Sequence, residues 1–220
     1  MSRQGDAVLF DIDGTLVDST YHHALAWHRA FSRLGEPPPM WRIHRTTGMG
    51  GDKLVGEVAG DAAEEQHGDD LRDLWRQEYL RIRAEVRPLP GAADLVRRLA
   101  TDGFRVALAS SGDPQFAQEA IDLLGIGEQV EVLTTSEDVE DSKPEPDLVG
   151  VTLERLGDVD RSVFVGDTPY DVEAAGRAGL RCVGLLSGGF SEAELTGAGA
   201  VLVVGSPADL LEADWASYLS

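Results

Sequence analysis

Four aspartates in two short stretches are the residues of this sequence best suited to do chemistry together. Asp11 and Asp13 directly follow the first apolar run of the chain, and Asp167 and Asp171 follow a later one. Carboxylates gathered in a small volume cannot all stay ionised without a counter-charge. If the fold brings the two stretches together, a hard divalent cation with oxygen ligands would resolve the repulsion. The simpler alternative for the first stretch is a strand that ends in an acidic turn.

Two further polar segments lie at comparable places in the chain. Ser110, Ser111 and Gly112 follow another apolar run and offer hydroxyls and free backbone amides. Lys143 stands in a stretch that contains two prolines, residues 142–146. Each segment alone has a structural explanation, such as a serine at a helix N-terminus or a surface lysine. Four polar segments in this order, three of them directly at predicted strand ends, instead indicate one shared site.

Short segments rich in valine and leucine are predicted to be the strands that position these residues. They do not alternate cleanly between apolar and polar residues, which is typical of a sheet covered on both faces. The predicted strands are residues 7–10, 105–109, 130–133, 163–165, 181–185 and 200–204. Predicted helices separate most of them, at residues 92–101, 114–124, 147–156 and 171–178. This alternation predicts an α/β fold with a Rossmann-like parallel sheet flanked by helices, in which ligands bind beyond the carboxyl ends of the strands.

The stretch between the first two predicted strands breaks this alternation. It carries only helical patterns, at residues 21–34, 53–59 and 71–84, separated by a proline run at 37–39 and a glycine-rich turn at 48–51. We expect it to form an inserted α-helical cap over residues 18–87. The α/β core would then comprise residues 1–17 and 88–220.

Composition narrows the classes of function. The chain has 220 residues, 42% of them hydrophobic, which is enough for one core and a smaller insertion. A net charge of −20 argues against a nucleic-acid partner, although a local site can still attract a small anion. Cys182 is the only cysteine, which excludes an intramolecular disulfide, and it lies in a predicted core strand. We see neither a leader segment nor an apolar run long enough to span a bilayer, so we expect a cytoplasmic protein with no membrane partner.

With these segments in this order, the chain resembles the haloacid dehalogenase (HAD) superfamily of phosphotransferases. The similarity runs over nearly the whole chain and includes four motifs: residues 11–15, Ser110, Lys143, and Gly166-Asp167 with Asp171. The place of the cap resembles the C1 subclass, which includes phosphoglycolate phosphatase and beta-phosphoglucomutase. The resemblance implies a HAD-like core and Mg²⁺-dependent chemistry on a small phosphorylated metabolite, either phosphoglycolate-like or a sugar phosphate. The motif set is highly specific for the superfamily and weak on substrate.

The resemblance also implies a role for each motif residue. Asp11 would be the nucleophile that forms an aspartyl-phosphate, and Asp13 would be the general acid and base. The carboxylates of Asp11 and Asp167 and the backbone carbonyl of Asp13 would hold Mg²⁺, with Asp171 acting directly or through water. The cation would screen Asp11 from the anionic phosphate that it attacks. Lys143 would place a fixed positive charge beside the phosphoryl oxygens and Asp11.

The segment at 110–112 would bind the same phosphoryl oxygens. The Ser110 hydroxyl and the Ser111 amide would donate hydrogen bonds to them, and Gly112 belongs to the same loop. Asp13 must be available in its neutral form to act as an acid. Its pKa should therefore be raised, or be controlled by the bound substrate.

Cap residues are expected to set the leaving group. His22 and His23 lie on the first predicted cap helix, just beyond Asp13. By the resemblance, His23 aligns with a histidine that assists proton transfer in the sugar-phosphate mutase branch; the alternative is a polar residue near a hinge. In the 48–51 turn, Gly50 would let the backbone approach a small substrate, and the alternative is a plain connection between helices.

Other cap residues bear on the choice between reactions. The mutase branch carries an arginine about where Gly51 stands, and this chain lacks it, although Lys53 or Arg45 could substitute. Four large apolar residues are more simply explained as cap core than as groups that stack on substrate: Trp27, Phe31, Leu34 and Trp41.

We therefore expect a hydrolytic, Mg²⁺-dependent phosphatase. A beta-phosphoglucomutase-like phosphomutase is the main alternative. A catalytically silent binding protein is the alternative of another class, although no motif residue is missing. The metal-free dehalogenase branch replaces the second aspartate of the first motif, whereas Asp13 is present here. The sequence leaves the natural substrate and the oligomeric state open.

Overall fold

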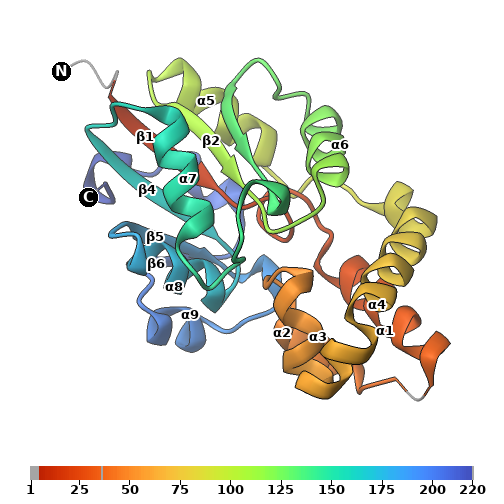
Figure 1. Ribbon diagram of the computed structural model, residues 1–220. Helices are drawn as coiled ribbons and strands as arrows, with labels where there is room; N and C mark the ends of the chain where they lie inside the picture. Colours follow the sequence, from red (N-terminus) through yellow and green to blue (C-terminus); the bar gives the residue numbers. More distant parts are fainter. Residues whose placement is uncertain (1–4, 36, 220) are drawn as a thin grey trace.

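The protein is described by a computed structural model over residues 5–35 and 37–219 (Figure 1). Within these residues, one parallel sheet contains six strands in the order β3-β2-β1-β4-β5-β6. The strands are β1 (Asp6–Phe10), β2 (Arg105–Ala109), β3 (Val130–Thr134), β4 (Arg161–Gly166), β5 (Arg181–Leu185) and β6 (Leu202–Val204). The predicted parallel sheet is confirmed, with strand ends that differ by at most two residues. The chain order reverses at β1, which pairs with β2 on one side and β4 on the other.

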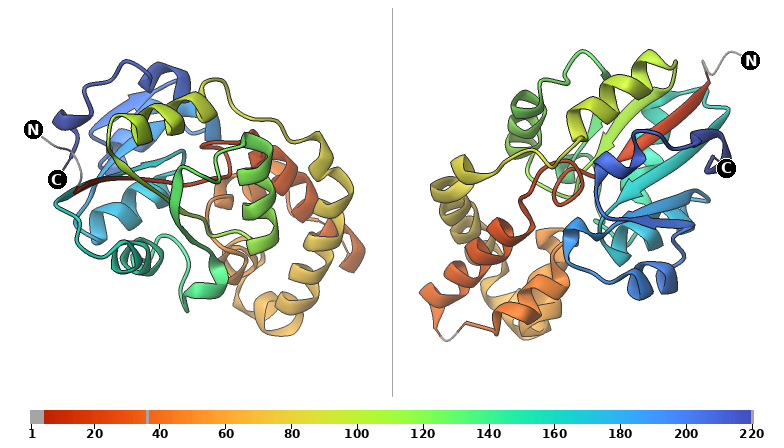
Figure 2. Two further views of the ribbon diagram at one scale, coloured as in Figure 1. Left: turned by 90° about the horizontal axis from the view of Figure 1, so that it is seen from above. Right: turned by 180° about the vertical axis from the view of Figure 1, so that it is seen from behind.

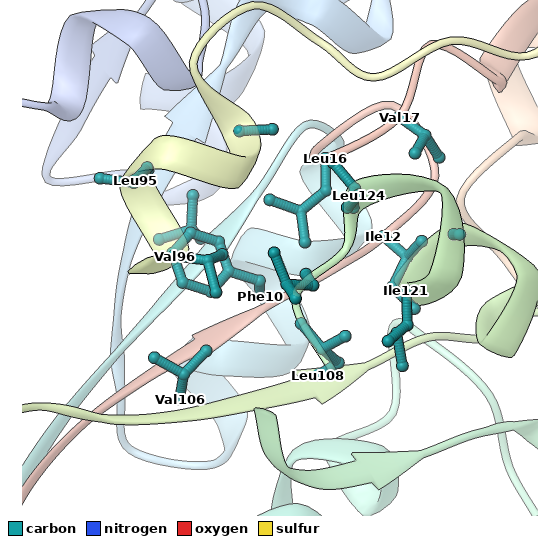
Figure 3. Close-up of a cluster of buried hydrophobic side chains, with 14 of the residues drawn as sticks. Phe10, Ile12, Leu16, Val17, Leu95, Val96, Val106, Leu108, Ile121 and Leu124 are labelled. Atoms are coloured by element: carbon teal, nitrogen blue, oxygen red, sulfur yellow. The ribbon is translucent and has the colours of Figure 1, made fainter. Parts of the chain in front are cut away.

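Both faces of the sheet are covered, which explains why the strands read as continuous apolar runs. Val8 and Phe10 of β1 point to one face, where they join the cluster built around α5 (Ala92–Thr101) and α6 (Pro114–Leu124) (Figure 3). Ala7 and Leu9 point to the other face, toward α7 (Asp147–Leu156), α8 (Pro169–Arg177) and α9 (Glu192–Ala198). Cys182 lies buried in the second cluster, as predicted.

A block of helices is inserted between β1 and β2, and we call it the cap. It contains α1 (Thr20–Leu34), α2 (Met40–Thr46), α3 (Gly51–Ala59) and α4 (Asp61–Ile82), and a 3-10 turn follows at Arg83–Glu85. The cap has an apolar cluster of its own, in which Trp27, Phe31, Ile43 and Leu71 are buried. In each view of Figures 1 and 2, the cap lies at the end of the sheet toward which the strands run.

Several details of the cap differ from the sequence prediction. The structure contains helix α2, which was not predicted. Helix α4 begins at Asp61, whereas the predicted start was residue 71. The prediction missed its first turns because they are acidic and lack an apolar stripe. The interpretation of Trp41 and Leu34 as cap core is wrong, since their exposed fractions are 68% and 46%. Helix α2 is short and buries Ile43 and Thr46, so Trp41 is left on its outer side. No helix in the described part of the chain is both long enough and apolar enough to cross a membrane.

Candidate active site

The two aspartate stretches meet because their strands are neighbours. Phe10 of β1 pairs with Val165 of β4, and the Asp11 amide donates a hydrogen bond of 2.9 Å to the Val165 carbonyl. Three buried side chains at this sheet end each offer an oxygen within 4.8 Å of the others: Asp11, Asp167 and Asp171. Parallel packing of β1 beside β4 thus brings together residues that are far apart in the sequence.

Asp171 is oriented by the start of α8. Thr168 is the N-cap of this helix, and its amide and hydroxyl donate to Asp171 Oδ2 at 3.0 and 2.7 Å. The Asp167 amide donates to the same oxygen at 3.2 Å. These bonds hold Oδ2 and leave Oδ1 for Lys143, whose Nζ lies 2.7 Å away. The reciprocal bonds between Thr168 and Asp171 form a capping box, a motif that the sequence analysis did not identify.

One carboxylate oxygen of Asp167 is a candidate ligand for a cation. Its Oδ1 accepts a hydrogen bond of 2.8 Å from the Thr15 hydroxyl. Its Oδ2 is buried and has no hydrogen-bond partner in the part of the chain that the structure describes. Gly14, with φ +79°, lets the backbone turn against this oxygen, and a Cβ there would overlap with it. A buried carboxylate oxygen without a donor is the kind of atom that a cation binds.

Lys143 lies inside the site, with only 1% of its surface exposed. Its Nζ is 2.5 Å from Asp11 Oδ1 as well as 2.7 Å from Asp171 Oδ1. Burial acts to lower the pKa of Lys143, but the charges of Asp11 and Asp171 raise that pKa above its usual value. The lysine therefore stays charged, and it compensates part of the negative charge of the cluster.

The raised pKa values of two buried acids indicate that the compensation is incomplete. Burial raises the pKa of Asp11 to about 7; the charges of Asp171 and Asp13 add to this effect, and Lys143 opposes it. Burial also raises the pKa of Asp167 well above its ordinary value, with further contributions from Asp171 and Asp11. Carboxylate oxygens in excess over one ammonium group fit a hard divalent cation such as Mg²⁺. Asp13 does not add its side chain to this cluster.

Residues at the start of the cap contact the side chain of Asp13. Its Oδ1 accepts a hydrogen bond of 2.6 Å from the Ser19 hydroxyl and lies 2.9 Å from His23 Nε2. His23 is stacked on Tyr79 of α4, with ring centroids 4.1 Å apart. Burial acts to raise the pKa of Asp13, but the charge of His23 and hydrogen bonds from His23 and Ser19 bring that pKa below its ordinary value. His22 does not line the cavity described below, and its buried Nδ1 has no partner within the described residues.

The predicted phosphate-binding segment follows β2 at the same sheet end. The Gly112 amide donates to Ser110 Oγ at 3.0 Å, which shapes the turn. The Ser111 hydroxyl is buried and has no hydrogen-bond partner among the described residues. Both serines and Gly112 line the cavity that also contains Asp11 and Asp13. The segment thus presents an uncommitted hydroxyl beside the acidic cluster.

A cavity of about 350 Å³ lies between the cap and the acidic cluster. Gly48, Met49 and Gly51 line it from the cap, and the Gly50 amide donates to Ser142 Oγ at 3.0 Å. A Cβ at position 50 would lie 2.5 Å from the Ser142 Cβ. The glycine turn therefore packs directly against the loop that carries Lys143.

The family of the chain follows from comparison with known proteins. Residues 6–179 match the family model of the haloacid dehalogenase-like hydrolases. This protein is a HAD-like hydrolase. The match confirms the predicted family and the prediction of a hydrolytic enzyme.

Relatives of this HAD-like hydrolase agree with the assignment. A phosphoglycolate phosphatase from Pseudomonas putida is 31% identical over 188 residues, which cover 82% of this chain and 69% of the relative. The crystal structure of a hydrolase from Pseudomonas syringae superposes with a TM-score of 0.88 at 33% identity, covering 94% of this chain and 96% of the other. A beta-phosphoglucomutase from Clostridium difficile has a TM-score of 0.80 at 20% identity, covering 96% and 93%, which shows a common fold.

In this HAD-like hydrolase, α4 adds cavity residues that the sequence analysis missed. Arg72, Trp75 and Arg76 line the cavity, and their spacing of three and four places them on one face of the helix. Arg72 Nη1 donates to the Gly51 carbonyl at 3.0 Å, so an arginine does stand beside Gly51, although it comes from another helix. Neither Arg45 nor Lys53 is among the residues that line the cavity.

Proposed function

We propose that this protein is a Mg²⁺-dependent phosphatase that hydrolyses a small phosphorylated metabolite through an aspartyl-phosphate on Asp11. The observation that carries the proposal is the arrangement of the site. Asp11 contacts Lys143, belongs to an acidic cluster suited to a cation, and lines the same cavity as Asp13 and the 110–112 segment. Relatives named phosphoglycolate phosphatase support a phosphomonoester as the substrate.

In the first step, a carboxylate oxygen of Asp11 forms a bond to phosphorus as the bond to the leaving oxygen breaks. The leaving oxygen takes a proton from Asp13, whose Oδ1 lies 2.9 Å from His23 Nε2, and departs as an alcohol. In the second step, water gives its proton to Asp13 and its oxygen to phosphorus, which releases inorganic phosphate and restores Asp11. The sum is one phosphomonoester and one water converted to one alcohol and one phosphate.

The residues around Asp11 divide the remaining work. Asp11, Asp167 and Asp171, with the Asp13 carbonyl, would hold Mg²⁺, which supplies positive charge to screen the nucleophile and the phosphoryl oxygens. Lys143 orients Asp11 through the 2.5 Å contact, donates to Asp171 as well, and has one N–H left to offer to the phosphoryl oxygens. The Ser111 hydroxyl, which has no partner among the described residues, would bind them as well.

To act as an acid, Asp13 must carry a proton, but the substrate-free protein favours its carboxylate form. Its pKa lies below the ordinary value because His23 and Ser19 stabilise the carboxylate. The negative charge of a bound phosphate would act in the opposite direction and raise the pKa of Asp13. Of the two possibilities left open by the sequence, we therefore propose control by the bound substrate.

The cavity favours a phosphatase over a phosphomutase. A bisphosphate intermediate needs a cation for its second phosphate, and Arg72 beside Gly51 is already paired with Glu64 and Asp69. The beta-phosphoglucomutase likeness, at 20% identity, supports the fold only. We keep a cytoplasmic setting and a small phosphorylated substrate as parts of the proposal.

Release of inorganic phosphate from p-nitrophenyl phosphate tests the proposal. We expect turnover with Mg²⁺, loss of turnover after chelation, and loss in Asp11→Asn, with the exposed Asp70→Asn as a matched control. Conversion of beta-glucose 1-phosphate in the presence of glucose 1,6-bisphosphate would instead support the mutase. Absence of phosphate release under all conditions would support a silent binding protein.

A further inference from the structure

The cavity carries an excess of negative charge outside the catalytic cluster. In the part of the chain that the structure describes, Arg72 and Arg76 are the guanidinium groups that line it, and the only other basic residue in its lining, His23, contacts Asp13. Among the described residues, five further carboxylates line it: Asp52, Asp73, Asp113, Glu137 and Glu140. The kind of leaving group that the cavity accepts depends on which of these charged side chains have no partner of opposite charge.

Arg72 is neutralised by its own helix. Its Nη1 lies 2.8 Å from Glu64 Oε1, and its Nη2 lies 2.9 Å from Asp69 Oδ1. Arg72 Nη1 also donates a hydrogen bond to the Gly51 carbonyl. Two carboxylates around one guanidinium leave this group with a net negative charge. Arg72 is therefore a poor partner for an anionic group of a substrate.

Arg76 is likewise engaged, in this case with the core. Its Nε donates to Asp113 Oδ2 at 2.8 Å, and its Nη2 donates to Gln115 Oε1 at 2.7 Å. The guanidinium also lies over the Phe116 ring, 5.4 Å from the centroid. Asp113 and Arg76 cancel each other, so this pair adds no net charge to the cavity.

The other four carboxylates have no such partner. Asp52, Asp73, Glu137 and Glu140 form no ion pair with any lysine or arginine in the described residues. They come from separate parts of the fold: Asp52 from the start of α3, Asp73 from α4, and the glutamates from the loop after β3. The cavity is thus lined by exposed carboxylates from both the cap and the core. Lys143 is not available there, because it contacts Asp11 and Asp171.

We infer that the leaving group is uncharged or cationic, so that the substrate is the phosphomonoester of a polyol or an amino alcohol. The inference rests on the proposed phosphatase function. Carboxylates accept hydrogen bonds from hydroxyl groups and bind ammonium groups, whereas a second carboxylate or phosphate next to the scissile ester would meet like charge. A phosphorylated carboxylic acid and a sugar bisphosphate are therefore disfavoured, although relatives are named for phosphoglycolate.

A matched series of two-carbon substrates tests this inference on the full chain with Mg²⁺. O-phosphoethanolamine, 2-hydroxyethyl phosphate and 2-phosphoglycolate differ only in the group at the far carbon: amine, hydroxyl or carboxylate. At low ionic strength, kcat/KM for the amine and hydroxyl compounds should exceed that for the carboxylate by about tenfold. The ratio should shrink in 0.5 M salt because exposed charges are screened.

Substitutions of Glu137 and Glu140 test whether these residues cause the preference over the carboxylate compound. In the double variant Glu137→Gln with Glu140→Gln, the preference over 2-phosphoglycolate should fall by about threefold or more. The matched control is Glu128→Gln with Glu154→Gln, two exposed glutamates that do not line the cavity, and it should keep the wild-type ratio.

Two results would overturn the inference. The first is a kcat/KM that is highest for 2-phosphoglycolate, and the second is a ratio that the Glu137 and Glu140 variant leaves unchanged. In either case, hydrolysis of p-nitrophenyl phosphate would still support the proposed function. Failure to hydrolyse any phosphomonoester, p-nitrophenyl phosphate included, would instead overturn the proposed function and this inference together.

Discussion

Replacement of Lys143 by methionine should harm both stability and catalysis. The sequence alone favours a small effect on stability, within about half a kcal/mol, if this lysine is exposed. In the structure the lysine is buried: its side chain is 1% exposed, and its Nζ lies 2.5 and 2.7 Å from two buried carboxylate oxygens. Removal of one partner from a buried ion pair typically costs about 3–5 kcal/mol, since it leaves the other charge uncompensated.

The measurement is the unfolding of the metal-free protein at pH 7.5. For a chain of this size, a loss of that order lowers the melting temperature by about 6–20 °C. Mg²⁺ should restore part of the loss in Lys143→Met, because a bound cation compensates Asp11 and Asp171 in place of the ammonium. Turnover of p-nitrophenyl phosphate should fall by about 10²–10³ even with Mg²⁺ present.

Lys53→Met is the matched control. Lys53 is partly exposed, and its Nζ lies 3.4 Å from Asp141, so we expect a change within about 1 kcal/mol. A metal-free Lys143→Met protein that melts within two degrees of the Lys53→Met control would refute the argument, since the buried carboxylates would then not depend on the lysine for compensation.

Three further predictions concern the nucleophile, the cation and the glycine turn. Asp11→Asn should lower turnover by more than about 10³ while circular dichroism stays that of the wild type; substantial remaining activity would remove Asp11 from its role. Because burial raises the pKa of Asp11 to about 7, the folded metal-free protein binds a proton that the unfolded chain releases near pH 4. The contribution of Asp11 to the stability should therefore fall as the pH rises from about 4 to 7, and the gain in melting temperature from Mg²⁺ should be larger at pH 8 than at pH 5; an equal gain at both would argue against these carboxylates as ligands. Gly50→Val should push the turn away from Ser142 and change the ranking of substrates more than the hydrolysis of p-nitrophenyl phosphate, whereas an equal loss for all substrates would make the turn only a connection between helices.

The core of the fold was readable from the sequence because its signals are local. Each predicted strand is a short apolar run, and both faces of the sheet are covered, so the runs stand out from the helices between them. The motif residues at 11, 110 and 167 were placed at one sheet edge for the same reason. Parallel strands put their carboxyl ends together, whatever the length of the connections.

The cap was less predictable because its details depend on tertiary packing. The first turns of α4 have no apolar stripe, and Trp41 is an aromatic residue on a short helix whose buried face lies elsewhere. Nothing local shows that Arg72 and Arg76 reach the cavity, since this depends on how α4 lies against the core. The contact between His23 and Asp13 is of the same kind: the sequence places His23 on a helix just beyond Asp13, and the docking of α1 determines the contact.

The place of β1 in the middle of the sheet has a consequence for the newly made chain. β1 leaves the ribosome before both of its partners, which are β2, about 98 residues later, and β4, about 155 residues later. Until then its unpaired edges are exposed to other chains, and the intervening cap helices can form only among themselves. The carboxylates at 11 and 167 meet only when β4 is in register with β1. A nascent or truncated chain that ends before residue 167 therefore contains Asp11, the proposed nucleophile, without the rest of its acidic cluster, and we expect it to be inert toward phosphate esters.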